Sequence, residues 1–454
     1  MEPDAMENPS VELKAELAEA PVGKLHRKLG AAMAALTLFD GYDTFNPAYV
    51  IHYVREPWLL SPQQAGMLVS SGLIGFLFGA ALHGGVADRF GRRVTLLGGL
   101  WIITVFSLLT ALLADSFTVF CALRVATGLG LGVLLPLSTT YINELAPRRT
   151  ANAFSLWGVA FGWALGGTMA GVVGVFLTPV IGWQGLYWVG GLSALLLPVL
   201  HRHLPESPQF LLMRGDDAAV RDLLSRLRPE RAKWYAHASI QRATHESKPS
   251  MLALLAPGCR RLTLAIWTAS FLSLFSIFGL SAWIPSLMLA RGETFGASFG
   301  YGALLQIASF AGGLACGHLI DQYGFARGWL ALWWLAGSAS VFALLFASGH
   351  IANIVISAVA GFGIIGAQFV LNNFTAAAYP TSVRATGVGM ELAVGRLGAI
   401  LGPYIGGLLQ QHHRGPRTML LSIGIACIGA ALAALAAKQP AHRAARPGMG
   451  RAEP

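Results

Sequence analysis

Twelve apolar stretches, each long enough to form a membrane-spanning helix, run through this chain. A helix needs about 20 apolar residues to cross the hydrocarbon core of a bilayer. A polar segment, residues 202–259, divides the stretches into six and six. The predicted spans are residues 29–52, 62–87, 94–114, 118–142, 151–176, 183–201, 260–290, 298–320, 328–347, 351–378, 385–411 and 417–437. The sequence therefore predicts an all-α membrane protein with twelve transmembrane helices.

The composition supports a membrane protein. Only 12% of the 454 residues are charged and 54% are hydrophobic, with a mean hydropathy of +0.57. Soluble domains carry about 25% charged residues, so this chain has too few charges to cover a water-facing surface. Four scattered cysteines show no disulfide or zinc spacing, and no phosphate-binding loop is present. We therefore expect no metal and no cofactor; any energy source would be an ion gradient such as that of protons.

Lys and Arg residues collect on one side of the predicted membrane. With the N-terminus inside, 26 of the 32 fall in internal segments and 4 in external loops. Internal loops are enriched in positive charge, so both termini are predicted in the cytoplasm, in a multi-pass inner (plasma) membrane protein. The same asymmetry explains the net charge of +10 without nucleic acid as a partner. The predicted regions are a tail (1–28), of which the first 23 residues lack regular structure, a first bundle (29–201), a central loop (202–259), a second bundle (260–437) and a tail (438–454).

The two bundles repeat one another. The segment Gly84–Arg93 and the segment Gly317–Arg327 share a Gly-x-x-x-Asp pattern, and their aspartates lie 233 positions apart. Pro147 and Pro380 show the same offset at a separate place. One offset at several places predicts two pseudo-symmetric six-helix halves, which is a transporter architecture.

Two acidic residues, Asp40 and Asp43, lie near the middle of the first span. A carboxylate inside a bilayer is costly and usually faces the bundle interior or a water-filled cavity. The spacing i, i+3 places both on one face of a helix. Protonation neutralises such a group, so we predict that at least one of them couples proton movement to transport. Which one does so stays open, as does the alternative that one merely pairs with a cation or shapes the helix at Asn46–Pro47.

These motifs resemble the major facilitator superfamily, and more narrowly its aromatic acid:proton symporter family. Gly84–Arg93 fits the superfamily signature of the loop between spans two and three. The narrower resemblance rests on Asp40-Gly41-Tyr42-Asp43 and on the span-eleven pattern from Tyr379 to Pro403. It implies proton-coupled import of an aromatic or related small organic acid by alternating access. We also expect the protein to act as a monomer. Leu137 after Pro136 and Glu391 in span eleven depart from the family pattern; the role of Glu391 stays open.

The intramembrane cations Arg396 and Arg124 are candidate substrate-binding residues. A guanidinium grips a carboxylate through two parallel hydrogen bonds. Trp163 stands at the position of Arg396 in the first-half repeat, and a cation facing an aromatic side chain would suit a carboxylate attached to a ring. Pairing of Arg124 with a first-span Asp, and of Arg396 with Glu391 or an Asp, are the structural alternatives. Further candidates, for which packing is the alternative, are Tyr42, Asn372 and Asn373.

A third set of residues is predicted to gate the inner side, because the resemblance implies that the loop between spans two and three contacts span eleven. The alternative is that these charged residues only determine the orientation of the protein in the membrane. In the second-half copy, Gln322 replaces the basic residue after Asp321. We therefore expect the second-half loop to hold the inner side closed less strongly than the first-half loop does. The predicted gating residues are Gly84, Asp88, Arg89, Gly91, Arg92, Arg93, Glu144, Asp321 and Arg384.

Other functions fit parts of the same sequence. A drug or metabolite:proton efflux antiporter would share the loop signature, but the glycine-rich fifth span lacks the proline-glycine motif expected there. A sugar:proton symporter is favoured by Pro205–Pro208 and disfavoured by two acids in the first span. A membrane enzyme would need a reactive constellation, and a sensor would need a long soluble output domain. Neither is apparent in the sequence, so we expect a transporter and not an enzyme.

Overall fold

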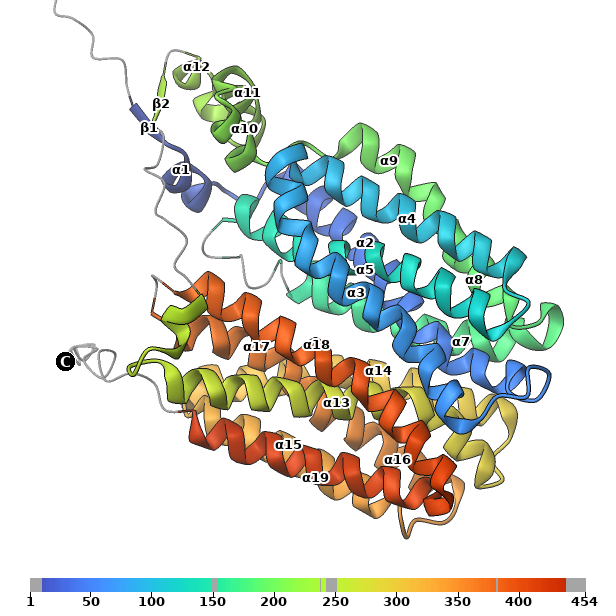
Figure 1. Ribbon diagram of the computed structural model, residues 1–454. Coiled ribbons are helices and arrows are strands. Elements are labelled where there is room, and N and C mark those ends of the chain that lie inside the picture. Colours follow the sequence, from blue (N-terminus) through green and yellow to red (C-terminus); the bar gives the residue numbers. More distant parts are fainter. Residues whose placement is uncertain are drawn as a thin grey trace, which may run out of the picture.

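The computed structural model describes residues 10–147, 150, 154, 156–236, 238–241, 251–380 and 383–437, and they form two helical bundles (Figure 1). The N-terminal half crosses the membrane in six passages. They are α2 (Lys24–Val54), α3 (Pro62–Phe90), α4 (Arg92–Leu113), α5 (Phe117–Leu145), η1 (Leu156–Ala160) with α7 (Phe161–Ile181), and α8 (Gln184–Gly191) with η2 (Leu192–Leu195) and α9 (Leu196–His203).

The C-terminal half repeats this arrangement. Its passages are α13 (Arg260–Ala290), α14 (Phe295–Tyr323), α15 (Ala326–Ala343), α16 (His350–Ala360) with η5 (Gly361–Ile365) and α17 (Gly366–Ala378), α18 (Arg384–Leu409) with η6 (Gln410–Arg414), and α19 (Gly415–Ala436). The twelve predicted spans are therefore confirmed, and α13 has the predicted bounds. Helices α3 and α14 each contain 29 residues and begin 233 positions apart, as the repeat requires.

Within the described residues, nine helices are long and apolar enough to cross a membrane by length and composition alone. The other three predicted spans fall outside that set for identifiable reasons. Asp40 and Asp43 lower the mean hydropathy of α2, and the sixth passage is divided among α8, η2 and α9, of 8, 4 and 8 residues. Helix α15 has only 18 residues, and Arg327 lies near its start.

The N-terminal tail is more ordered than the sequence suggested. Residues Ser10–Glu12 form β1, which pairs in parallel with β2 (Ser239–Gln241), and α1 (Leu13–Glu19) follows. The buried Glu16 accepts hydrogen bonds from Arg228 (2.7 Å) and from the Tyr235 hydroxyl (2.6 Å). Our expectation of an unstructured tail was wrong here, because its partners lie more than 200 residues away in sequence.

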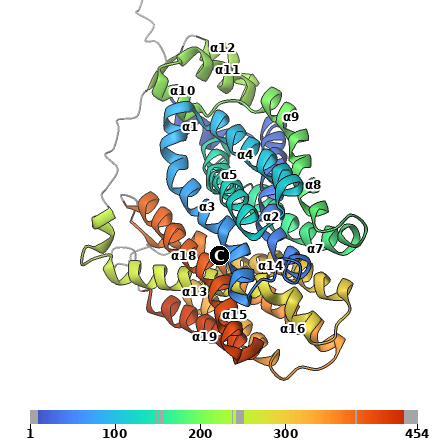
Figure 2. The ribbon, with the colours of Figure 1, turned by 45° about the vertical axis from the view of Figure 1, so that its right-hand side comes forward.

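The central segment forms a small helical cap on the N-terminal half. It contains α10 (Pro208–Arg214), α11 (Asp217–Leu227), η3 (Pro229–Arg231) and α12 (Ala232–Tyr235), and η4 (Met251–Leu255) precedes α13. Figures 1 and 2 both place α10, α11 and α12 near α1, at the end of the bundle where α2 begins. We call this end of the two bundles the basic end, because most Lys and Arg residues lie there. We call the other end of the bundles the opposite end.

The two halves meet closely towards the opposite end. A Cβ atom on Gly66 of α3 would overlap the carbonyl oxygen of Pro403 in α18, so only glycine allows these backbones to approach. Ser70 Oγ donates to the carbonyl oxygen of Ile400 at 2.7 Å. Gly84 of α3 and Gly389 of α18, nearer the basic end, have no such neighbour: a Cβ on either would meet no atom within 4 Å. The helices of the two halves also diverge towards that end in Figure 1.

Candidate functional site

The centre of the site is a fully buried turn of α2 that carries both predicted acids. Asp40 and Asp43 are each 0% exposed. Gly41 between them lies against the backbone of Trp163 in α7, where a Cβ would overlap the Trp163 carbonyl oxygen. This close approach holds the acidic turn of α2 inside the N-terminal half, and the two carboxyl groups meet different surroundings.

Asp43 forms a complete ion pair within the N-terminal half. Arg124 Nη1 of α5 lies 3.1 Å from Asp43 Oδ1, and Ser107 of α4 donates to Oδ2 at 2.6 Å. Arg124 Nη2 also donates to the Asp43 backbone carbonyl at 2.8 Å, and the guanidinium lies 5.7 Å from the centre of the Tyr187 ring. The alternative in which Arg124 pairs with a first-span Asp is therefore present, and three helices of one half hold the pair together; substrate binding by Arg124 has no support here.

Asp40 has no such partner. Neither of its carboxyl oxygens has a hydrogen-bond partner among the described residues, and the nearby Thr44 hydroxyl lacks hydrogen-bond geometry. The cation that acts on it electrostatically is Arg396, from α18 in the other half. The Arg396 guanidinium lies 3.7 Å from the centre of the Phe76 ring and makes no hydrogen bond or ion pair with the described residues. The structure thus brings Asp40 and Arg396 into the same region without joining them.

The aromatic candidates divide into two groups. Tyr42 is 1% exposed, and its hydroxyl donates to the carbonyl oxygen of Leu186 at 2.9 Å, so it is held inside the N-terminal half. Trp163 lies at the junction of the halves, with its ring centre 5.0 Å from Phe45 and 6.0 Å from Phe369. Of these two candidates, only Trp163 contacts both halves.

The polar candidates of the second half surround Glu391. This residue is 0% exposed, and its Oε1 accepts from Ser270 Oγ at 2.5 Å and from Gln368 Nε2 at 3.4 Å. Gln368 Nε2 also donates to Asn372 Oδ1 at 3.1 Å. Asn372 is half-buried and Asn373 is exposed. As expected from their spacing, Glu391 and Arg396 form no direct pair.

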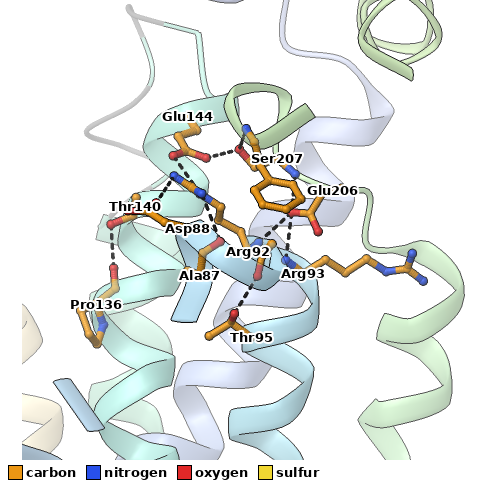
Figure 3. Close-up of polar contacts among 12 residues, drawn as sticks. Ala87, Asp88, Arg92, Arg93, Thr95, Pro136, Thr140, Glu144, Glu206 and Ser207 are labelled. Atoms are coloured by element: carbon orange, nitrogen blue, oxygen red, sulfur yellow. Dashed lines mark hydrogen bonds and ion pairs between the residues drawn. The ribbon is translucent and has the colours of Figure 1, made fainter. Parts of the chain in front are cut away.

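Four of the predicted gating residues of the first half, Asp88, Arg92, Arg93 and Glu144, lie in a compact polar network at the basic end (Figure 3). Arg92, the first residue of α4, reaches Asp88 Oδ1 at 3.1 Å and Glu144 Oε1 at 3.5 Å. The other oxygen of Glu144 accepts from the Ser207 hydroxyl, which precedes α10. The network therefore ties α3, α4, α5 and the central segment together.

Glu206 supplies the N-terminal cap of α4. Its Oε1 accepts from the backbone N–H groups of Arg92 at 2.8 Å and Arg93 at 3.1 Å, as an anion at a helix N-terminus should. Gly91 joins α3 to α4 with φ +103°, and a Cβ there would overlap Glu206. Arg214 donates to the carbonyl oxygen of Arg89 at 3.0 Å, which adds a second link to the central segment. Gly84, in contrast, lies within α3, before the turn, and its part in gating stays a prediction.

Among the residues that the structure describes, the second-half copy shows no counterpart of the Arg92–Glu144 ion pair. Asp321 is exposed near the end of α14, and Ala377 occupies the repeat position of Glu144. Phe325 occupies the position of Arg92, with a left-handed φ of 52°. Arg327 donates to the carbonyl oxygen of Ala437 at 3.4 Å, and Arg384 is the first residue of α18. That the second-half loop holds the inner side closed less strongly than the first-half loop stays a prediction.

Sequence reasoning missed several partners of the site. Ser107 and Phe76 carry no motif, and their roles depend on the packing of α4 and α3. Glu206 stood in the quoted Pro205–Pro208 motif, so that motif could have identified it as a helix cap. The described residues contain no group of three His, Cys, Asp or Glu side chains that could hold a metal ion.

Comparison with known proteins agrees with this architecture. The sequence profile of the Major Facilitator Superfamily matches residues 31–403, and the chain belongs to that family. The niacin transporter NiaP of Acinetobacter baylyi is 30% identical over 400 residues, covering 87% of this chain and 90% of that protein. The 4-hydroxybenzoate transporter PcaK of Pseudomonas putida is 30% identical over 407 residues, covering 88% and 90%.

A solved structure shows the same fold. The xylose transporter XylE of E. coli, in a partially occluded inward open conformation, superposes with a TM-score of 0.70 at 19% identity and covers 91% of this chain and 97% of that one. The protein is therefore a multi-pass membrane protein of the major facilitator fold, and a transporter instead of an enzyme.

Proposed function

We propose that the protein imports a small aromatic carboxylate together with a proton across the inner membrane, by alternating access and with both termini in the cytoplasm. The observation that carries this proposal is the arrangement of Asp40 and Arg396. Among the described residues, Asp40 has a buried carboxyl without hydrogen-bond partners and Arg396 has a buried guanidinium without an ion pair, and the two come from different halves into the same region.

Arg396 is the group best suited to hold the substrate carboxylate. Its guanidinium offers parallel donors in a fixed fork, and no acceptor among the described residues occupies them. Aromatic side chains from both halves lie in the same region, so the substrate ring could pack against Phe76, Trp163 or Phe369. The relatives that carry niacin and 4-hydroxybenzoate transport a carboxylate on a ring, which fits this pair of features.

Proton coupling follows from the balance of charge. In the empty carrier, an ionised Asp40 neutralises Arg396. When the substrate anion binds Arg396, Asp40 must take up a proton, because an uncompensated charge in a dry interior is costly. Asp43 is unsuited to this role because Arg124 already neutralises it within one half. We therefore assign coupling to Asp40.

Alternating access is supported by the uneven contacts between the halves. Glycines of α3 and α18 pack backbone to backbone towards the opposite end, whereas Gly84, Gly317 and Gly389 near the basic end meet no atom within 4 Å. Bare helix surfaces of this kind would allow α3, α14 and α18 to approach when the halves rock. The network around Arg92 would then form part of the inner gate, together with the start of α18.

Reconstituted protein would test the proposal. Vesicles are loaded and diluted to create an inward proton gradient, and accumulation of benzoate, 4-hydroxybenzoate, nicotinate, muconate and glucose is measured. We expect gradient-dependent accumulation of the aromatic acids. Accumulation of glucose alone would favour the sugar symporter, and gradient-driven loss of substrate from inside would favour the efflux antiporter.

The two aspartates provide a matched pair of variants. Asp40→Asn should abolish gradient-driven accumulation and leave substrate exchange between loaded vesicles intact, since a neutral amide mimics the protonated acid. Asp43→Asn should instead lower thermal stability, because it leaves the Arg124 charge unpaired in the interior. Full accumulation by Asp40→Asn would refute the assignment of Asp40 as the coupling residue.

A further inference from the structure

Glu391 is a second intramembrane carboxyl group that the proposed function leaves unused. It lies in α18, in the half opposite to Asp40, and is 0% exposed. No Lys or Arg among the described residues forms an ion pair with it. A buried acid without a fixed counter-charge is either permanently neutral or takes part in proton movement.

The contacts of Glu391 fit a carboxyl group that can be either ionised or protonated during the transport cycle. Ser270 Oγ and Gln368 Nε2 both donate to Oε1, and donors of this kind stabilise the ionised form. Its other oxygen, Oε2, is buried without a hydrogen-bond partner among the described residues, and burial of an unsolvated carboxylate oxygen favours the neutral form. The side chain therefore has donors for its negative charge and a separate position for a proton.

A polar route leads away from the buried carboxyl. Gln368 Nε2 lies within 3.4 Å of Glu391 Oε1 and 3.1 Å of Asn372 Oδ1, so one amide joins the two residues. Asn372 is half-buried, and the neighbouring Asn373 is exposed. Gln368 and Asn372 therefore form a hydrogen-bonded path along α17 from Glu391 to a half-buried position, by which water could exchange a proton with Glu391.

Glu391 and Asp40 share one cation. Among the described residues, Arg396 is the cation near both carboxyl groups, and Tyr379 is a further titratable group near Glu391. In the empty carrier Arg396 neutralises Asp40, and the donors Ser270 and Gln368 hold Glu391 in its ionised form with the help of the same guanidinium. When a substrate anion occupies Arg396, neither acid has a counter-charge left, so both would be driven to bind a proton.

We propose that Glu391 is a second proton-carrying carboxyl group, so that each cycle moves two protons inward with one monovalent organic anion. This inference rests on the proposed coupling through Asp40. The loaded carrier takes one proton on Asp40 and one on Glu391 from the outer solution, and both leave with the substrate on the inner side. One net positive charge then moves inward per cycle, so the membrane potential drives uptake in addition to the pH gradient.

The test separates the two driving forces in vesicles of reconstituted full-length protein with benzoate or 4-hydroxybenzoate. At equal pH on both sides, an inside-negative potassium diffusion potential of about 60 mV should drive about tenfold accumulation by the wild type, since one charge gains about 2.3 kcal/mol per 100 mV and tenfold corresponds to about 1.4 kcal/mol. A pH gradient of one unit at zero potential should give a limit of about 100-fold, which is about tenfold for each proton.

Glu391→Gln should remove the response to potential and lower the limit from the pH gradient to about tenfold. Glu391→Asp keeps an ionisable group and should retain the response to potential, which guards against a glutamine variant that fails to fold. Glu56→Gln, an exposed loop carboxylate, is the matched control and should behave as the wild type.

The outcomes are distinguishable. Accumulation by the wild type under a pH gradient but not under a potential would overturn the second proton and leave the proposed function standing. An unchanged potential response in Glu391→Gln would overturn the role of Glu391. Absence of accumulation under either gradient, with exchange intact, would overturn proton coupling itself and this inference with it.

Discussion

The two intramembrane arginines occupy opposite kinds of site. Arg124 is 1% exposed and bound on several sides within the N-terminal half, by Asp43 Oδ1 at 3.1 Å and by the Asp43 carbonyl at 2.8 Å. Arg396 is 8% exposed and lies between the halves, where it stacks on Phe76 without an ion pair among the described residues. Both are buried cations, but only one has a fixed partner.

The difference concerns which contacts can change during a transport cycle. Contacts within one half move with it as the halves rock, so the Asp43–Arg124 pair would be preserved in every state. Contacts between halves are broken and remade. A substrate carboxylate can therefore compete for Arg396 but not for Arg124, and we interpret Arg124 as structural and Arg396 as functional.

The largest expected effect is on stability. Arg124→Ala would leave the Asp43 carboxylate buried without its cation, and breaking a buried pair in this way costs about 3–5 kcal/mol. We expect a large fall in the melting temperature of the detergent-solubilised protein. Arg396→Ala should lower the melting temperature much less, because Arg396 makes no direct ion pair with the described residues and Asp40 can take up a proton in its absence; equal losses in the two variants would contradict the comparison.

The next effect is on substrate affinity. Arg396→Lys keeps the charge but replaces a two-pronged donor by a point charge. Losing a hydrogen bond to a charged group costs about 1.5–3 kcal/mol, so apparent affinity measured by substrate exchange should fall about 10–100-fold. Arg226→Lys, on the exposed surface of α11, is the matched control. An unchanged affinity in Arg396→Lys would remove Arg396 from the substrate site.

The cap of α4 should contribute less. Glu206→Ala removes an acceptor shared by the N–H groups of Arg92 and Arg93, and loss of a helix N-cap costs about 0.5–2 kcal/mol. We expect a modest drop in melting temperature with substrate affinity unchanged. Glu230→Ala, an exposed glutamate of the same central segment, should have no comparable effect. A fall in affinity without a drop in stability would show that Glu206 does more than cap the helix.

The smallest expected effect is on transport rate, and it should distinguish the α3–α4 loop from its second-half copy between α14 and α15. Asp88→Asn weakens a partly exposed ion pair with Arg92, and such pairs contribute about 0–1 kcal/mol. We expect transport rates in vesicles to fall severalfold. Asp321→Asn should change the rate less than twofold, because Phe325 and Ala377 replace the partners that Arg92 and Glu144 supply in the first half. The reverse order would make the second-half loop the stronger gate.

Much of the fold was accessible from the sequence. The twelve spans, the six-and-six division and the 233-residue repeat follow from apolar length and motif spacing, which bilayer thickness constrains directly. The pairing of Arg124 with a first-span acid was one of several alternatives, and the sequence could not choose among them. The ordered N-terminal tail was missed, because the contact of Glu16 with Arg228 joins segments that are distant in the chain.

The sequence by itself determined that this chain spans a membrane in twelve helices and that charged groups lie within its first and eleventh spans. The tertiary structure decided which of those charges are already neutralised. Asp40 and Asp43 are three residues apart on one helix, and no local pattern distinguishes them. Only the packing of α4 and α5 against one of them, and of α18 near the other, gives Asp43 an ion pair and leaves Asp40 without a hydrogen-bond partner in the described part of the chain.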